Sequence, residues 1–211
     1  DFYNDPSKKI DVIGVTGTNG KTSCSYWLTN CLNILKSKSG FVGTMGYGNL
    51  SKLTPLSNTT PSAIHCQQII SELNSSAFKN IVMEISSHGI EQGRVSAIDF
   101  NIKLFTNLTR DHLDYHETIE KYEEVKTSFM LQSKKSVVVV NVDDKVGQNI
   151  YSKTVEQSQK FSYAIDNDAK VRAVNIKYLR DSTQFDLLYD NETSVVSAPI
   201  IGKFNIYNIL G

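Results

Sequence analysis

Cysteine is scarce in this sequence of 211 residues, which contains only Cys24, Cys31 and Cys66. Their number is odd and no pair has the CxxC spacing, so the pattern argues against a disulfide framework and against a zinc ribbon. Thiols used in this way fit a reducing compartment. We therefore expect a cytoplasmic protein that buries its cysteines as small apolar side chains.

Net charge is absent as well, because 22 Lys and Arg residues balance 22 Asp and Glu residues. Nucleic-acid and anionic-membrane surfaces depend on a clustered excess of basic residues, so we expect neither partner. No apolar run approaches the roughly 18 residues that a membrane span requires, and the N-terminus has no basic-then-apolar signal pattern. With 40% hydrophobic and 21% charged residues, the sequence has the composition of a globular protein.

An initiator methionine is also missing, since the first residue is Asp1. At the other end, Phe204–Leu210 has the apolar spacing of a helix and stands directly before Gly211. From these two features we expect a piece of a longer protein. Its length fits one large domain.

Short β-branched runs alternate with amphipathic stretches as far as Asn141. Strands are predicted at Ile10–Thr16, Phe41–Tyr47, Asn80–Ser86, Ile102–Asn107 and Ser136–Asn141. Helices are predicted at Lys21–Lys36, Ser62–Ala77 and Glu117–Gln132. This alternation predicts an α/β fold with a mostly parallel sheet flanked by helices.

Beyond about Lys160 the pattern changes to short strand-like runs separated by Asp, Asn and Ser turns. These runs cover Phe161–Ile165, Val171–Leu179, Phe185–Tyr189 and Ser194–Ala198. The pair Asp190-Asn191 stands where a hairpin would reverse. We predict a small antiparallel sheet near the C-terminus, attached to the same domain.

A glycine-rich loop joins the first predicted strand to the first predicted helix, and residues 14–23 read GVTGTNGKTS. Backbone N–H groups of such a loop attract phosphate, a lysine at Lys21 neutralises the β- and γ-phosphates, and the hydroxyl of Thr22 suits Mg²⁺. The spacing departs from GxxxxGK[ST], which needs a glycine where Val15 stands. The loop still predicts binding of a nucleoside triphosphate on a P-loop sheet.

GVT followed by GTNGKT resembles the phosphate loop of the Mur ligase superfamily, whose members join a carboxylate to an amine using ATP. Further segments stand in the order and spacing of its MurE branch: NTTP at 58–61, MEISSHG at 83–89, QGRV at 92–95, FTNLTRDHLDYH at 105–116, Lys126, NVDD at 141–144 and GKFN at 202–205. The SSHG, QGRV and TNLTRDHLDYH segments are specific to that branch. The chain is thus similar to a central ATP-binding domain, and the resemblance implies an N-terminal UDP-binding domain and a C-terminal amino-acid-binding domain outside this sequence.

The resemblance also implies a reaction. The whole protein would be an ATP-dependent ligase of peptidoglycan synthesis that adds a third amino acid to UDP-N-acetylmuramoyl-L-alanyl-D-glutamate through an acyl-phosphate intermediate. The amino acid would be meso-diaminopimelate, with L-lysine as the alternative. ATP would be the co-substrate and Mg²⁺ the cofactor, and we expect a monomer. Residues 1–211 alone are expected to show little or no ligase activity.

Three overlapping groups of site residues follow from the loop chemistry and the resemblance. The ATP-binding group is Gly17, Thr18, Asn19, Gly20, Lys21, Thr22 and Ser23. The metal group is Thr22, Glu84, His112 and Lys126, of which His112 and Lys126 are also assigned catalytic roles together with Lys21; Lys126 would be an N6-carboxylysine. The substrate group is Asn58, Thr59, Thr60, Ser86, Gln92 and Arg94.

Simpler interpretations stay open for some of these residues. A lysine in the sequence YEEVK is ordinarily an exposed helix cation paired with Glu123 or Glu124. If Lys126 instead points inward, burial lowers its pKa and leaves a neutral amine that adds CO₂. Without the resemblance Arg94 would be a surface charge, and Thr60 or Ser62 would serve as a helix N-cap.

Other residues in the matching segments receive no individual role. They are His88, Arg110, Asp111 and His116. The pair Asp143-Asp144 follows a predicted strand and either approaches the nucleotide ribose or caps the following helix.

Two rival functions remain from other classes. A folylpolyglutamate or cyanophycin type of ligase would share the phosphate loop but should lack the SSHG, QGRV and Thr-Thr-Pro segments. A non-enzymatic scaffold would be expected to lose ligands, whereas Lys21, Thr22, Glu84, His112 and Lys126 are all present.

Overall fold

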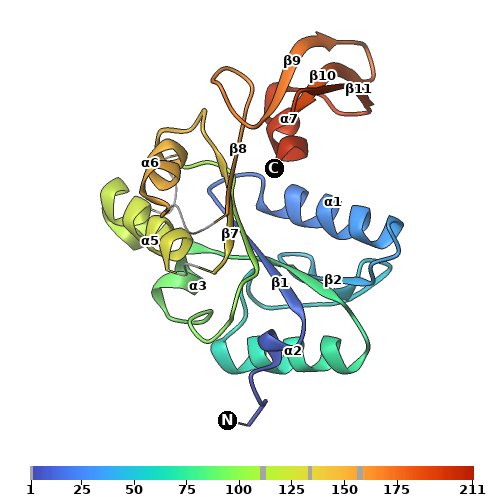
Figure 1. The fold of residues 1–211 in the computed structure, drawn as a ribbon. Helices are drawn as coiled ribbons and strands as arrows, with labels where there is room; N and C mark the ends of the chain where they lie inside the picture. The colour runs from blue at the N-terminus through green and yellow to red at the C-terminus, as the bar shows by residue number, and fades with distance from the viewer. Residues whose placement is uncertain (1, 110–112, 133–134, 156–158) are drawn as a thin grey trace.

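The structure, a computed structural model, describes residues 2–109, 113–132, 135–155 and 159–211. Within them the strands form one sheet of eleven, in the order β11-β10-β9-β8-β7-β6-β1-β5-β2-β3-β4. Figure 1 shows the chain with the helices around these strands. The strands are β1 (Asp11–Thr16), β2 (Ser39–Gly43), β3 (Gly46–Asn49), β4 (Lys52–Thr54), β5 (Asn80–Glu84), β6 (Ile102–Phe105), β7 (Val137–Asn141), β8 (Lys160–Ala164), β9 (Val171–Tyr178), β10 (Thr183–Tyr189) and β11 (Glu192–Ala198).

The run from β2 to β9 in this order is parallel, and the sheet is antiparallel at both ends. A short 3-10 turn (Pro6–Lys8) precedes β1. The α-helices are α1 (Lys21–Ile34), α2 (Ala63–Ser75), α3 (Ser87–Glu91), α4 (Leu113–His116), α5 (Ile119–Leu131), α6 (Lys145–Lys153) and α7 (Lys203–Leu210). The α/β fold predicted from the sequence is confirmed. None of the helices in the described ranges is long and apolar enough to cross a membrane.

Helices cover both faces of the parallel strands, and each face has its own core. Val12 of β1 packs in the cluster that contains residues of α2, α5 and α6, whereas the next residue, Ile13, packs in the cluster that contains residues of α1 and α7. Because successive strand residues point to opposite faces, burial on both sides requires an unbroken apolar run. This is the pattern that made β1 predictable.

Side-chain caps fix where several helices begin. The Ser62 hydroxyl accepts a hydrogen bond from the backbone N–H of His65 at the start of α2, so the N-cap interpretation of Ser62 is confirmed. Thr118 caps α5 in the same way. Asp144 caps α6 by accepting from Val146 and Gly147. Each cap satisfies backbone donors that the first turn of a helix leaves unpaired.

The prediction of one strand over Phe41–Tyr47 is wrong, because a hairpin turn divides that stretch. Gly43 of β2 pairs with Gly46 of β3, and Thr44 and Met45 form the turn between them. Gly46 has φ +121°, a conformation that favours glycine. The third strand of this meander, β4, was not predicted.

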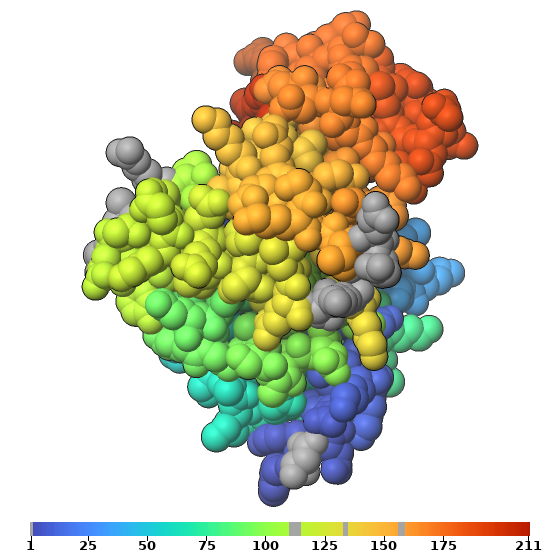
Figure 2. Space-filling view, turned by 60° about the vertical axis from the view of Figure 1, so that its left-hand side comes forward, coloured from blue at the N-terminus to red at the C-terminus, as the bar shows by residue number. Residues whose placement is uncertain are grey.

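The C-terminal strands differ from the prediction in one respect. Phe161–Ile165 was assigned to the antiparallel group, but β8 lies parallel to β7 because α6 carries the chain back across the sheet. The antiparallel group is β9 to β11, and Asp190 and Asn191 both have positive φ in the tight turn between β10 and β11. With α7 this group forms a lobe at the end of the molecule opposite the N-terminal segment (Figure 2).

The three cysteines are not all buried as expected. Cys24 and Cys66 lie in the core, where burial raises the pKa of each thiol to about 12, but Cys31 is exposed. Cys24 and Cys31 lie seven residues apart on α1 and so share one face, but the buried residues of α1 are Cys24, Ser25 and Thr29, and Cys31 lies beyond this buried part. No two of these cysteines form a disulfide.

Candidate functional site

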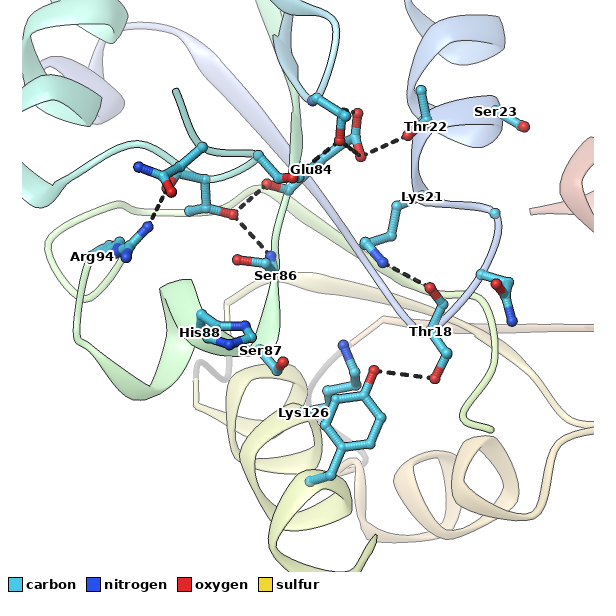
Figure 3. Close-up of a pocket in the computed structure, with 17 residues that line it drawn as sticks. Thr18, Lys21, Thr22, Ser23, Glu84, Ser86, Ser87, His88, Arg94 and Lys126 are labelled. Atoms are coloured by element: carbon cyan, nitrogen blue, oxygen red, sulfur yellow. Dashed lines mark hydrogen bonds between the residues drawn. The ribbon is translucent and has the colours of Figure 1, made fainter. Parts of the chain in front are cut away.

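A cavity of about 590 Å³ opens where the carboxyl ends of β1 and β5 meet the start of α1 (Figure 3). This edge of a parallel sheet is where open α/β folds bind ligands. Most of the residues predicted from the sequence line it: Thr18, Asn19, Gly20, Lys21, Thr22, Ser23, Asn58, Thr59, Thr60, Glu84, Ser86, Arg94 and Lys126. Gly17 and Gln92 stand close to lining residues but do not line it themselves, and His112 lies outside the described residues.

Two glycines of the loop are required by close approach as well as by conformation. A Cβ on Gly17 would lie 1.9 Å from Thr106 Oγ1, and one on Gly20 would lie 2.3 Å from Asn208 Oδ1. Both residues also have positive φ, +148° and +88°. Although the loop departs from the common spacing, it keeps glycine at positions 17 and 20, where the backbone passes close to Thr106 and Asn208.

The segment after β6 braces the loop, a role that the sequence reasoning missed. Asn107 accepts hydrogen bonds from Thr18 N through its carbonyl (2.8 Å) and from Asn19 N through Oδ1 (3.0 Å). Thr106 Oγ1 donates to the carbonyl of Asn19 at 2.6 Å. These residues belong to the matching TNLT segment, so the motif was visible, but no local pattern showed that it contacts the loop.

The Lys21 ammonium is held over the loop by two carbonyl groups. Its Nζ donates to the carbonyls of Gly17 (2.9 Å) and Thr18 (2.8 Å). Both contacts come from the loop itself, so the positive charge stands beside the backbone that would surround a phosphate.

Glu84, fully buried at the end of β5, is tied to both sides of the cavity. Its Oε2 accepts from the Thr22 hydroxyl at 2.9 Å, and its Oε1 accepts from the backbone N–H of Thr44 at 3.0 Å. Burial raises the pKa of the Glu84 carboxyl, while the hydrogen bonds from Thr22 and Thr44 and the charge of Lys21 oppose that rise. Carboxylate and hydroxyl oxygens close together are the ligand types that Mg²⁺ prefers.

Lys126 points inward from α5, and its side chain is only 1% exposed. Nζ donates to the carbonyl of Gly17 at 3.1 Å and lies 4.8 Å from the centre of the Tyr122 ring. The alternative of an exposed cation paired with Glu123 or Glu124 is therefore wrong, because this lysine is buried; Glu123 accepts from Asn149. Tyr122, which the sequence reasoning also missed, lines the cavity and has its hydroxyl 3.2 Å from Thr18 Oγ1.

The predicted substrate residues lie along the opposite wall. Thr60 is buried, and its hydroxyl donates to the carbonyl of Glu84 and accepts from Ser86 N, both at 2.9 Å. Its carbonyl accepts from Arg94 Nη1 at 2.8 Å, and Gln92 Oε1 accepts from Arg94 Nε. Thr60 and Gln92 thus hold their neighbours in place, while Arg94 presents its guanidinium to the cavity. Asn58 and Thr59 lie in the loop before Thr60 and also face the cavity.

A cluster of aromatic rings packs beside the predicted substrate residues. His88 lines the cavity, and its ring centre lies 4.0 Å from that of Tyr115 and 5.7 Å from that of His116. His116 is buried, with Nδ1 3.3 Å from a carboxylate oxygen of Glu91. These contacts join α3 to α4 beside the cavity.

A second cavity of about 590 Å³ lies on the other side of the phosphate loop. Asn19, Gly20 and Ser23 line both cavities, and the remaining residues around the second one are Asn107, Asn141, Asp143, Asp144, Phe204, Tyr207 and Asn208. Asp144 caps α6, as one of its two alternatives predicted, and it also lines this cavity. A hollow of about 930 Å³ at the opposite edge of the sheet contains none of the predicted site residues.

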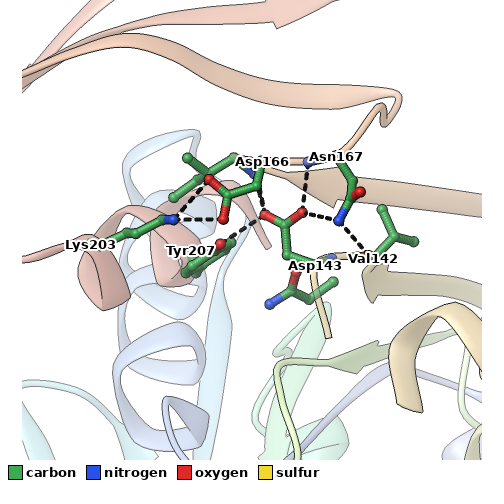
Figure 4. Close-up of polar contacts among 8 residues, drawn as sticks. Val142, Asp143, Asp166, Asn167, Lys203 and Tyr207 are labelled. Carbon is green, nitrogen blue, oxygen red and sulfur yellow. Dashed lines mark hydrogen bonds and ion pairs between the residues drawn. The ribbon is translucent and has the colours of Figure 1, made fainter. Parts of the chain in front are cut away.

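Asp143 is held by donors from two segments, the turn after β8 and α7 (Figure 4). Its carboxylate accepts from the backbone N–H groups of Ile165 (2.6 Å), Asp166 (2.9 Å) and Asn167 (2.8 Å), and from the Tyr207 hydroxyl (2.7 Å). Asp166 in turn pairs with Lys203 of α7 at 2.6 Å. Asp143 thus connects the end of β7 to the turn after β8 and to α7.

We expect Asp143→Asn to lower the melting temperature of this chain at neutral pH by about 4–8 °C, which corresponds to a loss of about 2 kcal/mol from weakened charge-assisted hydrogen bonds. Burial alone raises the pKa of Asp143, but the donated hydrogen bonds outweigh it and lower the pKa from 3.8 to about 2. A carboxyl with a depressed pKa stabilises the fold above its unfolded pKa and loses that effect as the pH falls through the folded value. The difference between wild type and variant should therefore shrink between about pH 4 and pH 2.

The same change at Asp168, whose side chain is 99% exposed, is the matched control and should leave the melting temperature unchanged. Calorimetric melting curves across the pH range test both variants. Equal melting temperatures for wild type and Asp143→Asn at pH 7 would show that the carboxylate does not tie these segments together.

In the described ranges no group of three or more His, Cys, Asp or Glu side chains is placed to hold a metal ion. The residues whose oxygen atoms would suit Mg²⁺ are Glu84 and Thr22, which are hydrogen-bonded at 2.9 Å beside the phosphate loop. This pair fits one cation that shares its remaining ligands with a bound phosphate or water.

The sequence matches a family of known enzymes over almost its full length. The family model described as Mur ligase middle domain matches residues 15–211. A UDP-N-acetylmuramoyl-L-alanyl-D-glutamate–2,6-diaminopimelate ligase from Bacillus velezensis is 36% identical over 216 residues, covering 99% of this chain and 44% of that protein. The ligase of the same name from Ralstonia nicotianae is 39% identical, covering 96% of this chain and 41% of that protein. The chain thus spans less than half the length of these relatives.

Solved structures show the same relationship. A structure of a ligase with this name superposes with a TM-score of 0.87 at 31% identity, covering 95% of this chain and 41% of its own. MurF from Acinetobacter baumannii reaches a TM-score of 0.77 at 19% identity, covering 98% of this chain and 42% of its own, and shows the fold alone. The resemblance drawn from the phosphate loop and the SSHG and QGRV segments is confirmed. The chain belongs to the Mur ligase middle domain family.

Proposed function

We propose that this chain is the MgATP-binding middle domain of a ligase that adds meso-diaminopimelate to UDP-N-acetylmuramoyl-L-alanyl-D-glutamate. The proposal rests on one observation, that residues of the phosphate loop, Glu84 and Arg94 all line the same cavity. Relatives at 36–39% identity bear the name of that ligase. In this proposal the chain is one of three domains, and the other two bind the UDP group and the incoming amino acid.

The reaction needs an activated acyl group, because an ionised carboxylate resists attack by an amine. Transfer of the γ-phosphoryl group of ATP to the glutamate carboxylate breaks the bond to ADP and forms an acyl phosphate. The amine then attacks the acyl carbon, the bond to the phosphate oxygen breaks, phosphate leaves and the nitrogen loses a proton. Enzymes accelerate such transfers mainly by positioning the reactants and stabilising charge.

Each wall of the cavity has a part in this scheme. The N–H groups of Gly20–Ser23, at the start of α1, would surround the phosphates, since those of Thr18 and Asn19 are bonded to Asn107. Lys21 balances the charge on the γ-phosphoryl group. Glu84 and Thr22 hold Mg²⁺, which when bound would screen that charge further. Arg94 faces the anionic substrate with a planar fork of donors, and Asn58, Thr59, Thr60, Ser86 and Gln92 complete the substrate wall.

Lys126 is proposed to carry an N6-carboxyl group and, with His112, to hold a second Mg²⁺. Addition of CO₂ to the neutral amine forms a carbamate and releases a proton, which replaces a cation by an anionic oxygen ligand. Supporting this, Lys126 is buried and its Nζ stands 3.1 Å from the carbonyl of Gly17, beside the phosphate loop.

The nucleoside of ATP is proposed to occupy the second cavity, on the far side of the loop. That cavity shares Asn19, Gly20 and Ser23 with the first, so a nucleotide whose phosphates lie on the loop reaches into it. Asn208 and Tyr207 from α7 supply amide and aromatic groups there. We further propose that the ligase is cytoplasmic and monomeric and that it binds neither nucleic acid nor membrane.

The test is the release of ADP by the full-length protein. We expect release that requires the UDP-dipeptide and meso-diaminopimelate together, with L-lysine a poor replacement, and a tripeptide product visible by mass spectrometry. Residues 1–211 alone should form no tripeptide at a comparable rate. Absence of turnover with every amino acid tested would favour the scaffold alternative, and turnover of a folate substrate would favour a different ligase class.

A further inference from the structure

Thr44 lies in the turn between β2 and β3, outside every motif that the sequence reasoning used. Its backbone N–H donates to Glu84 Oε1 at 3.0 Å, and its Oγ1 lies 3.2 Å from Glu84 Oε2. The same Oγ1 is 3.1 Å from the hydroxyl of Thr59 in the substrate loop. One exposed threonine thus contacts both oxygens of the buried carboxylate and the substrate wall.

The direction of each hydrogen bond follows from the number of protons. An ionised carboxylate only accepts, so the Thr44 hydroxyl donates its one proton to Glu84. The bond to Thr59 must then run the other way, with Thr59 donating to Thr44. Because Thr22 also donates to Glu84 Oε2, a continuous chain of hydrogen bonds runs from the substrate loop through Thr44 and Glu84 to the phosphate loop.

The sheet determines the place of Thr44. Val42 of β2 pairs with Met83 of β5, so the residues that follow each strand come out side by side at the carboxyl edge. Gly43 lets them approach, because a Cβ there would lie 2.2 Å from Glu84 Oε1. A substitution that removes the Thr44 hydroxyl therefore removes the contact with Glu84 Oε2 and keeps the backbone donor to Glu84 Oε1.

We propose that Thr44 is a positioning residue that orients Glu84 for Mg²⁺ and couples that site to the loop holding the UDP-dipeptide. This inference rests on the proposed function of the cavity. Loss of the hydroxyl leaves Glu84 Oε2 with one hydrogen bond fewer and leaves Thr59 without its acceptor. Both Mg²⁺ affinity and the affinity for the UDP-dipeptide should fall, because Thr44 contacts Glu84 on one side and Thr59 on the other.

The experiment compares Thr44→Val, which keeps the shape and loses the hydroxyl, with Thr44→Ser, which keeps the hydroxyl. In the full-length protein we expect Thr44→Val to raise the Mg²⁺ concentration for half-maximal turnover about tenfold, the effect of one hydrogen bond to a charged group, and to raise KM for the UDP-dipeptide. Thr44→Ser should stay within about twofold of wild type. Thr193→Val makes the same substitution on β11, at the far end of the sheet, and is the matched control, which should keep the wild-type Mg²⁺ dependence.

Calorimetric binding of a non-hydrolysable ATP analogue at several Mg²⁺ concentrations separates the two proposals. Normal turnover and unchanged Mg²⁺ dependence in Thr44→Val would overturn the role of Thr44 and leave the ligase function standing. A wild type that binds MgATP but turns over no amino acid would overturn the ligase function, while weaker Mg²⁺-dependent binding in Thr44→Val would still support the positioning role. A wild type without Mg²⁺-dependent nucleotide binding would overturn both.

Discussion

Lys21→Met is expected to lower the kcat/KM of the full-length protein for ATP-dependent ligation by about a thousandfold or more. A cation aimed at a transferring phosphoryl group stabilises charge that develops only in the transition state, and groups of this kind contribute about 10³–10⁵ to the rate. Lys21 is well placed for this role, since its ammonium is held over the loop by the carbonyls of Gly17 and Thr18. Steady-state release of ADP in the presence of all three substrates measures the effect.

Lys177→Met on the exposed side of β9 makes the same chemical change far from the loop and should leave kcat/KM unchanged. The melting temperature of Lys21→Met should stay within a few degrees of wild type, which separates lost catalysis from lost folding. A variant that keeps more than about a tenth of the wild-type kcat/KM would show that Lys21 does not balance the phosphoryl charge.

The parallel part of the fold was predictable because each strand is covered on both faces. Ile81, Val82 and Met83 of β5 are all buried. An unbroken apolar run between polar ends therefore indicates a strand that is covered on both faces. The hairpin between β2 and β3 was not predictable in this way. Its turn is stabilised by the hydrogen bond from Thr44 N to Glu84, two residues separated by 40 positions, and no local pattern contains a contact of that range.

The residues of the candidate site were likewise predictable where their pattern is local and not where it depends on long-range contacts. The loop residues Gly17–Ser23 are contiguous and carry their chemistry in their order, so they were found together. Lys126 shows the limit of that approach, because its helix pattern favours an exposed cation and only its contact with Gly17, 109 residues away, places it inside. Tyr122 and Asn107 were missed for the same reason, since their contacts with Thr18 and Asn19 arise only when α5 and the end of β6 pack beside the loop.

The other large effect is expected from Lys126→Ala in the full-length protein, which should lose about a hundredfold or more in kcat. If Lys126 carries a carboxyl group that holds Mg²⁺, the alanine variant lacks that ligand and leaves a space where the buried side chain stood. A short-chain carboxylic acid added to the assay can enter this space and supply the oxygen atoms, so activity should rise with the concentration of acetate or formate. Wild type should not respond to either acid.

Lys121→Ala on the same helix is the matched control, because Lys121 is exposed and pairs with Glu117 at the surface. That variant should keep wild-type activity with and without acid. Uptake of isotope-labelled bicarbonate into a carbamate carbon, observed by NMR, gives a second readout that does not depend on turnover and should be present in Lys121→Ala but absent in Lys126→Ala. Full activity of Lys126→Ala without added acid would disprove the carboxylysine, and lost activity that no acid restores, with no labelled carbamate in wild type, would assign Lys126 the simpler role of a buried cation that braces Gly17.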